Sequence, residues 1–180
     1  MLRSLLLAEH SKAQRDKIVH WIGEDSKRFD QLINLFLHDE DPKVIQRAAW
    51  PLSYAAIAHP KLVGKHLGKL LKNLEKPNIH EAVRRNTLRL LQDIPLPEKY
   101  HGIIMDTCFR LVTDPQQKPA TKAFSLTILD KLSHIYPDIR PELLTIIDEQ
   151  WDNESAAFRS RARKIQPFDQ LRDRRRTVNR

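Results

Sequence analysis

The sequence predicts an all-α fold built from stacked helical hairpins, and three observations lead to this expectation. A short pattern centred on a basic residue recurs at a nearly fixed interval. Most prolines stand between apolar-periodic stretches or at their starts, where the missing N–H does no harm to a helix. Only four glycines are present, and no run of alternating apolar residues predicts a sheet.

The recurring basic residues are Arg47, Arg85, Lys122 and Arg159, which follow one another at intervals of 38, 37 and 37 residues. A weaker copy lies upstream at Arg15, 32 residues before the first of them. A period of this size is typical of helical hairpins that stack on one another, because a single hairpin cannot bury its own apolar face.

The clearest copy is the stretch Asp39–Leu52, which reads as a helix from its first turn onward. Asp41 is a good N-cap, since its carboxylate accepts the unpaired N–H groups that follow. Pro42 then occupies the first helical position. One apolar stripe follows at helical spacing: Val44, Ala48, Leu52 and Ala55. Pro51 stands inside this helix and is expected to kink it or to open a carbonyl.

The same criteria predict about five hairpins, which together form one repeat domain over residues 1–165. The hairpins are expected at 1–23, 26–59, 60–95, 97–135 and 138–165, and a basic flexible tail at 166–180. The first has Ser11 as an N-cap and Gly23 as a C-terminal stop. The third is expected to begin with one continuous helix over Pro60–Lys76, in which Gly64 and Gly68 indicate close packing.

The stretch that begins at Asp39 resembles the second helix of a HEAT repeat, the unit of an armadillo-like α-solenoid. The residues that fit the family pattern are Asp39, Asp41, Pro42, Val44, Ala48, Ala49 and Leu52. The family's Arg directly after Val is Ile45 here. The chain looks like a small HEAT-like protein of the bacterial type. This resemblance implies a right-handed α–α superhelix in which the second helix of each hairpin lines a concave side.

The charge of the chain, +8 in total, is unevenly distributed. We call the second helix of each hairpin the inner helix. The inner helices of the first four hairpins hold eleven Lys and Arg against four acids, whereas the rest of residues 1–154 holds eleven against seventeen. Residues 155–180 hold nine against two. A basic concave groove that attracts a polyanion is therefore one interpretation.

Nine residues of the inner helices are candidates for a binding surface: Arg15, Arg47, Trp50, Tyr54, Arg84, Arg85, Arg89, Lys122 and Arg159. Arg84 and Arg89 fit an internal ladder less easily than the other basic residues. Two alternatives stay open for the five recurring basic residues, Arg15, Arg47, Arg85, Lys122 and Arg159. They line an open column, or they form an internal ladder with carbonyls or acids of neighbouring repeats, for which Asp41, Asp114 and Asp152 are candidate partners. The two aromatic residues are either core residues or a platform on which bases stack.

No catalytic motif is found, and we expect no cofactor and no metal. The eight histidines form no His-Glu-x-x-His, and neither a Gly-rich phosphate loop nor a Gly-x-Ser-x-Gly elbow occurs. The single cysteine, Cys108, excludes internal disulfides and cysteine-based zinc clusters, and its apolar neighbours predict an inert buried thiol. The chain is also similar in kind to the HEAT-like alkylpurine DNA glycosylases, but no motif here matches that family's catalytic Asp.

The favoured function is a non-catalytic interaction or scaffold module that holds a protein or peptide partner on the concave face. The alternative is a nucleic-acid-binding protein that uses the same face, with glycosylase-type activity. No stretch approaches the ~20 apolar residues that a membrane span needs. We therefore expect no membrane contact and a cytoplasmic location.

Overall fold

The structure is a computed structural model that describes residues 1–166 of the chain. All regular elements in this range are helical and none is a strand, so the predicted all-α fold is confirmed. The chain divides into two compact units, Met1–Tyr100 and His101–Arg180. The division falls inside the fourth expected hairpin, 97–135. That residues 1–165 form one repeat domain stays a prediction.

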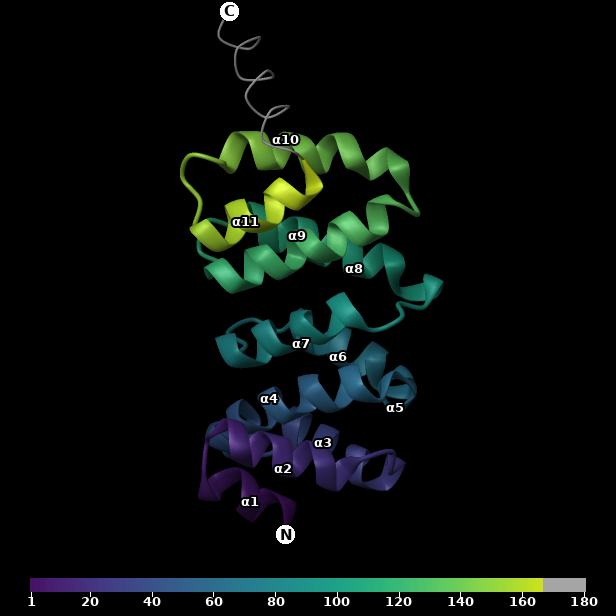
Figure 1. Ribbon diagram of the computed structural model, residues 1–180, viewed down its shortest axis with the longest axis vertical. Helices are drawn as coiled ribbons and strands as arrows, with labels where there is room; N and C mark the ends of the chain where they lie inside the picture. The colour runs from purple at the N-terminus through teal and green to yellow at the C-terminus, as the bar shows by residue number, and fades with distance from the viewer. Residues whose placement is uncertain (167–180) are drawn as a thin grey trace, which may run out of the picture. The chain divides into compact units, whose positions relative to one another are not determined.

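The first unit consists of helices that run back and forth across it (Figure 1). They are α1 (Leu2–Ala8), α2 (Lys12–Ile22), α3 (Ser26–His38), α4 (Pro42–Ala58), α5 (Pro60–Val63), α6 (Leu67–Leu74) and α7 (Glu81–Asp93), with the 3₁₀ turns η1 (Gly64–His66) and η2 (Glu98–Tyr100). The central helix is α4, which packs against α1, α2, α3, α5 and α7.

Helix α4 occupies this central place because one of its faces carries very small side chains. Its four alanines at the packing surface are fully buried: Ala48, Ala49, Ala55 and Ala56. Small side chains let the neighbouring helices approach closely without leaving voids. The helix continues through Pro51, which is buried inside it.

The local signals for helix ends are confirmed in the first unit. The Asp41 carboxylate accepts a hydrogen bond from the N–H of Lys43 at 2.9 Å. The Ser11 hydroxyl accepts one from the N–H of Gln14 at 3.1 Å. Gly23 ends α2 with a φ of 49°, a left-handed conformation that favours glycine.

The prediction of one continuous helix over Pro60–Lys76 is wrong, because η1 separates α5 from α6. The turn begins at Gly64, a residue of low helix propensity. It presents two basic side chains to Asp30 on α3. Lys65 Nζ and His66 Nε2 each lie 2.7 Å from an oxygen of that carboxylate. The break between α5 and α6 therefore coincides with an ion pair to Asp30 on α3.

The two glycines of this segment have different roles. A Cβ built on Gly68 would lie 2.9 Å from the hydroxyl oxygen of Tyr100, so the absence of a side chain allows this close approach. A Cβ on Gly64 would meet nothing within 4 Å. The prediction of close packing is confirmed for Gly68 and wrong for Gly64.

In the second unit the central helix is α9 (Pro119–Ser133), which packs against α8 (His101–Thr113), α10 (Arg140–Gln150) and α11 (Ala156–Ile165). A 3₁₀ turn, η3 (Pro137–Ile139), precedes α10. The side chains of the core are fully buried and include Leu126, Leu129, Ile147 and Phe158. Gln166, the first residue of the expected tail, is buried, and the remaining tail residues, 167–180, lie outside the described residues.

Candidate functional site

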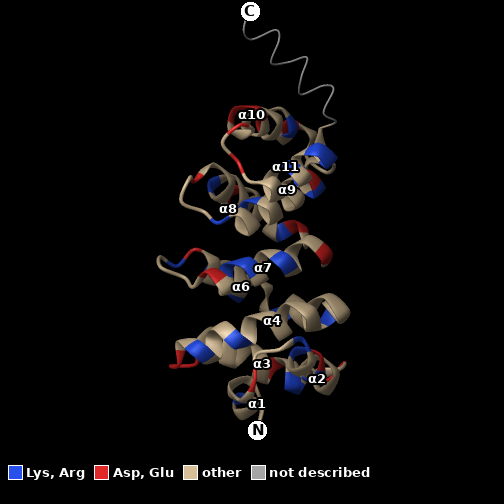
Figure 2. Ribbon diagram, turned by 60° about the vertical axis from the view of Figure 1, so that its left-hand side comes forward, with Lys and Arg blue, Asp and Glu red and all other residues tan. Residues whose placement is uncertain are grey.

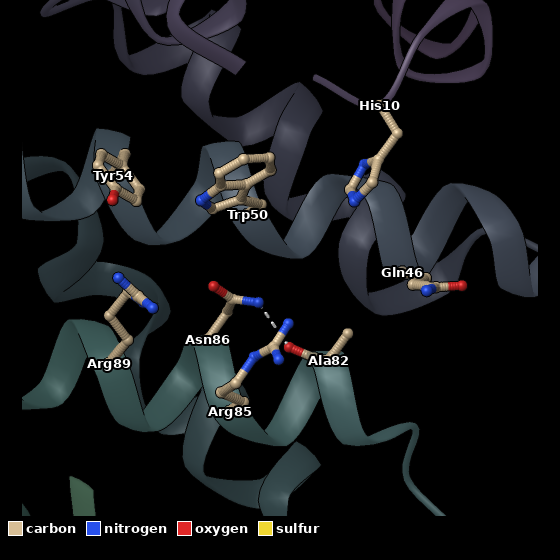
Figure 3. A pocket seen from close by; sticks show the side chains of 8 residues that line it. All are labelled: His10, Gln46, Trp50, Tyr54, Ala82, Arg85, Asn86 and Arg89. Atoms are coloured by element: carbon tan, nitrogen blue, oxygen red, sulfur yellow. Dashed lines mark hydrogen bonds between the residues drawn. The ribbon is translucent and has the colours of Figure 1, made fainter. Parts of the chain in front are cut away.

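A cavity of about 350 Å³ lies between α4 and α7 of the first unit. It is lined by His10, Gln46, Trp50, Tyr54, Ala82, Arg85, Asn86 and Arg89. Figure 3 shows the two aromatic side chains on α4 facing the two arginines on α7, with His10 and Gln46 toward one end. This volume lies at the lower end of the range of pockets that hold small ligands, roughly 300–1,000 Å³.

Helical spacing explains why these residues meet. The two aromatic residues are four positions apart on α4, and the two arginines are four positions apart on α7, so each pair shares one helix face. A buried hydrogen bond joins the two helices, since Ser53 Oγ donates to Asn86 Oδ1 at 3.2 Å. The amide nitrogen of Asn86 donates to the carbonyl of Ala82 at 2.8 Å. Asn86 therefore links α7 to α4 at the wall of the cavity.

Other side chains pack against the two aromatic residues of the cavity. Arg15 is only 7% exposed, and its guanidinium carbon lies 4.8 Å from the ring centroid of Trp50 and 3.9 Å from that of Tyr54. This is a cation–π arrangement with both rings. Its Nε donates to a carboxylate oxygen of Asp16 at 2.8 Å, so its charge is paired. The ring of His10 lies against Trp50, with 5.5 Å between the centroids.

The cavity is basic. None of its eight lining residues is acidic, and two are arginines. Arg85 is exposed, and Arg89 is half-buried with its guanidinium carbon 5.8 Å from the Tyr54 ring centroid. Arg84 is paired with Glu81, one turn earlier, at 3.5 Å. Figure 2 shows the basic residues of α7 as blue segments of its ribbon.

Arg47, although it follows the same sequence pattern, does not line the cavity. Its Nη1 donates to the carbonyls of Leu6 at 3.1 Å and Leu7 at 2.8 Å, in the last turn of α1. These carbonyls have no partner within their own helix. Arg47 thus bonds the preceding hairpin, as the internal-ladder alternative expects.

Lys122 lies in the second unit and is also engaged internally. It is 4% exposed, and its Nζ forms an ion pair with the carboxylate of Glu154 and lies 3.2 Å from Gln150 Oε1. Arg159 is half-buried, with Nη1 3.5 Å from the carbonyl oxygen of Trp151. Neither of these two residues belongs to the cavity of the first unit.

The acids that were expected as ladder partners have other roles. Asp41 caps α4, and Asp114 accepts a hydrogen bond from the N–H of Gln116 at 2.8 Å. Asp152 is exposed, and Glu154 takes the place expected for it beside Lys122. The carboxylates of Asp41 and Asp114 bind backbone N–H groups that lie only two residues further along the chain.

Four of the cavity residues were not among the sequence candidates: His10, Gln46, Ala82 and Asn86. Helical spacing could have found three of them, since Gln46 stands four positions before Trp50, and Ala82 and Asn86 stand three before the two arginines. His10 carries no such signal. It reaches the cavity from the segment between α1 and α2, whose position depends on tertiary packing.

Cys108, the single cysteine of the chain, is buried. Burial raises the pKa of the Cys108 thiol to about 12, so the thiol stays protonated, and its predicted burial is confirmed. No group of three or more His, Cys, Asp or Glu in residues 1–166 is placed to hold a metal ion. None of the helices described is both long and apolar enough to span a membrane.

Comparison with known proteins identifies the family of the chain. A family description of the HEAT repeat domain matches residues 2–167, nearly the whole sequence. No curated protein and no solved structure matches the chain. The match agrees with the helical hairpins, the capped start of α4 and its buried alanines. The chain belongs to the HEAT repeat family.

Proposed function

We propose that this protein is a non-catalytic interaction module that binds an acidic segment of a protein partner at the cavity between α4 and α7. HEAT repeats are in general scaffolds for protein interactions. The proposal adds to this the place and the chemistry of the contact. It retains four of the nine candidate residues, Trp50, Tyr54, Arg85 and Arg89, as the binding surface.

The observation that carries the proposal is a basic cavity without a single acid in its lining. Arg15 and Arg84 pair with neighbouring carboxylates, whereas Arg85 is exposed and the lining of the cavity contains no carboxylate. Guanidinium groups bind carboxylates through paired N–H donors.

The same geometry favours a peptide over a nucleic acid. Bases bind single-strand platforms by stacking on free aromatic faces. Here the guanidinium of Arg15 covers the rings of Trp50 and Tyr54, and His10 lies against Trp50. A glycosylase-type reaction would also need an acid beside the target base, and the lining residues include none.

Fluorescence anisotropy with labelled peptides tests the proposal. A peptide rich in Glu and Asp is compared with a neutral peptide of the same length and with a single-stranded oligonucleotide. We expect the acidic peptide to bind best and Arg85→Ala to weaken it about tenfold, since a hydrogen bond to a charged group contributes about 1.5–3 kcal/mol. Lys69→Ala, which removes an exposed positive charge on α6 outside the cavity, should leave the affinity unchanged.

Two outcomes would contradict the proposal. If Arg85→Ala and Lys69→Ala weaken binding equally, the effect is one of net charge, and the cavity is not the site. If the oligonucleotide binds more tightly than the acidic peptide and Arg85→Ala abolishes that binding, the nucleic-acid alternative is correct. Far-UV circular dichroism of each variant confirms that its helices are intact.

A further inference from the structure

We propose that His80 is a pH-dependent cap, which holds the start of α7 and one wall of the cavity between α4 and α7 only while its imidazole is neutral. Three hydrogen bonds in series connect this side chain to α4. As a control of ligand binding the cap rests on the proposed function, but its effect on α7 can be measured without any ligand.

The first link of the series is the cap itself. His80 is the N-cap residue of α7, and its Nδ1 accepts a hydrogen bond from the N–H of Ala82 at 3.1 Å. The usual N-caps are Ser, Thr, Asp and Asn, whose side-chain oxygens accept at any neutral or mildly acidic pH. A histidine accepts at Nδ1 only when that nitrogen carries no proton. This cap therefore requires the neutral imidazole with its proton on Nε2.

The next two links run from the capped residue to α4. Ala82 lines the cavity, and its carbonyl oxygen accepts a hydrogen bond from the side-chain nitrogen of Asn86 at 2.8 Å (Figure 3). Asn86 Oδ1 in turn accepts from Ser53 Oγ on α4 at 3.2 Å. All three residues are buried. The position of Ala82 therefore affects where Asn86 meets α4, and a displaced first turn of α7 would also carry the exposed Arg85 with it.

Protonation of His80 breaks the first link. An imidazolium carries a proton on both ring nitrogens and cannot accept a hydrogen bond from the N–H of Ala82. It also places a positive charge at the N-terminus of a helix, where the macrodipole favours a negative one. Histidine is the side chain whose ordinary titration falls between pH 5 and pH 8. The cap is therefore present at neutral pH and is lost as the pH falls, so the first turn of α7 should fray in mildly acidic solution.

The surroundings of His80 leave its imidazole open to solvent. The side chain is exposed and lines a second cavity, of about 280 Å³, to which α3, α4, α6 and α7 contribute. Among the described residues that line this second cavity, Lys76 is the only other charged one. Glu81, the next residue of α7, pairs with Arg84 at 3.5 Å. Lys76 and Glu81 are the charged neighbours of the imidazole, and both stay unchanged in the variants used below.

Amide hydrogen exchange of the full chain, followed by NMR, tests the cap. The protection factors of residues 82–84 are compared at pH 7.5 and pH 5.5, each corrected for the intrinsic exchange rate at that pH. We expect them to fall about fivefold at pH 5.5, the fold-change that corresponds to the ~1 kcal/mol of a typical N-cap. The first turn of α2 is the internal control, because its cap is the hydroxyl of Ser11, which does not titrate in this range.

Substitutions of His80 separate the cap from the other titrating groups. His80→Asn supplies a neutral oxygen acceptor at both pH values, so the protection of residues 82–84 should no longer depend on pH. His80→Ala removes the acceptor and should give the low protection already at pH 7.5. His10→Gln removes the histidine that lines the cavity between α4 and α7, and it should leave the pH dependence of residues 82–84 unchanged.

Two further NMR signals report on the tautomer and on the wall of the cavity. A long-range ¹H–¹⁵N spectrum at pH 7.5 should show the ring proton of His80 on Nε2. The side-chain amide protons of Asn86 should exchange faster at pH 5.5 than at pH 7.5, again relative to their intrinsic rates, in the natural protein but not in His80→Asn.

The outcomes that overturn the proposal are distinct. A ring proton on Nδ1 at pH 7.5 would show that His80 is no acceptor. Equal pH dependence of residues 82–84 in the natural protein and His80→Asn would assign the effect to another group. Fraying of residues 82–84 with unchanged exchange at Asn86 would refute the connection between the cap and the wall.

Binding of the acidic peptide gives the last comparison. At pH 5.5 the His80→Asn variant should bind it more tightly than the natural protein, and at pH 7.5 the two should bind it equally. Both proteins keep His10, so protonation of that residue and of the peptide affects them alike. Equal binding at pH 5.5 would overturn the control of binding by His80. Absence of binding to both proteins at both pH values would contradict the proposed function and leave the exchange measurements unaffected.

Discussion

At the scale of single residues, the structure distinguishes basic side chains that the sequence pattern groups together. Arg47, Arg85 and Lys122 occupy equivalent places in the repeat. Arg47 bonds carbonyls, Arg85 lines a cavity at the surface, and Lys122 is buried beside Glu154. The pattern predicts where a basic residue stands along its helix. The partner it meets depends on the neighbouring hairpin, which differs from one repeat to the next.

Removal of Lys122 should destabilise the protein strongly. The side chain of Lys122 is 5% exposed and that of Glu154 is 13% exposed. Lys122→Met leaves the glutamate unpaired at a largely buried site, and we expect the free energy of unfolding to fall by about 3 kcal/mol. Urea denaturation measures the change, with Lys118→Met at the exposed start of the same helix as the control. The double variant with Glu154→Leu should recover part of the loss. Equal effects of Lys118→Met and Lys122→Met would contradict this account.

Asp30 should make the stability of the first unit dependent on pH in the acid range. The hydrogen bond from Lys65, followed by that from His66, lowers the pKa of Asp30 below its ordinary value. An acid whose pKa is lower in the folded state stabilises the protein above its unfolded pKa of about 3.9, and this contribution is lost as the pH falls further. Asp30→Asn should therefore reduce the melting temperature at pH 7. The difference in melting temperature between the variant and the natural protein should become smaller as the pH falls below about 4. An equal deficit at every pH would show that the ion pair is not responsible.

At the scale of elements, short helices depend on contacts from outside themselves. Helix α1 has seven residues, and isolated helices shorter than about 12 residues are marginal in water. Its N-cap forms no side-chain hydrogen bond, but two carbonyls of its last turn accept hydrogen bonds from Arg47. The break at η1 illustrates the same dependence, since Lys65 and His66 bind a carboxylate on another helix. Neither interaction is visible in the local sequence.

Loss of the Arg47 side chain should release α1. Arg47→Met keeps a long apolar stem but removes the donors to the carbonyls of Leu6 and Leu7. We expect the free energy of unfolding to fall by about 1.5–3 kcal/mol, the contribution of a hydrogen bond from a charged group. Amide hydrogen exchange should quicken first in α1, with α9 unaffected. Lys43→Met, an exposed position one turn earlier on α4, is the control. Unchanged protection of α1 would mean that burial of Leu2 and Leu6 holds the helix without the arginine.

At the scale of the whole molecule, the net charge of +8 predicts a general attraction to polyanions that is separate from the cavity. Residues 167–180 contribute five arginines and two aspartates to it. We expect the protein to retard single-stranded DNA weakly at low ionic strength and to lose this binding as the salt concentration rises. A variant that ends at Gln166 should bind with a smaller salt dependence. Gel shifts over a salt series measure this. Binding that persists at high salt, or that requires Trp50, would indicate a specific nucleic-acid site instead.

The sequence by itself determined the all-α class, the repeat of helical hairpins and the capped start of α4. These features depend on local spacing and on the hydrogen-bonding needs of helix ends. The sequence also predicted both Trp50 and Arg85 as residues of a binding surface. Only the tertiary structure decided which candidates share a cavity, that Glu154 and not Asp152 pairs with Lys122, and that His10 completes the site. The physical reason is that helix–helix packing positions side chains from distant parts of the chain, and this positioning leaves no periodic trace in the sequence.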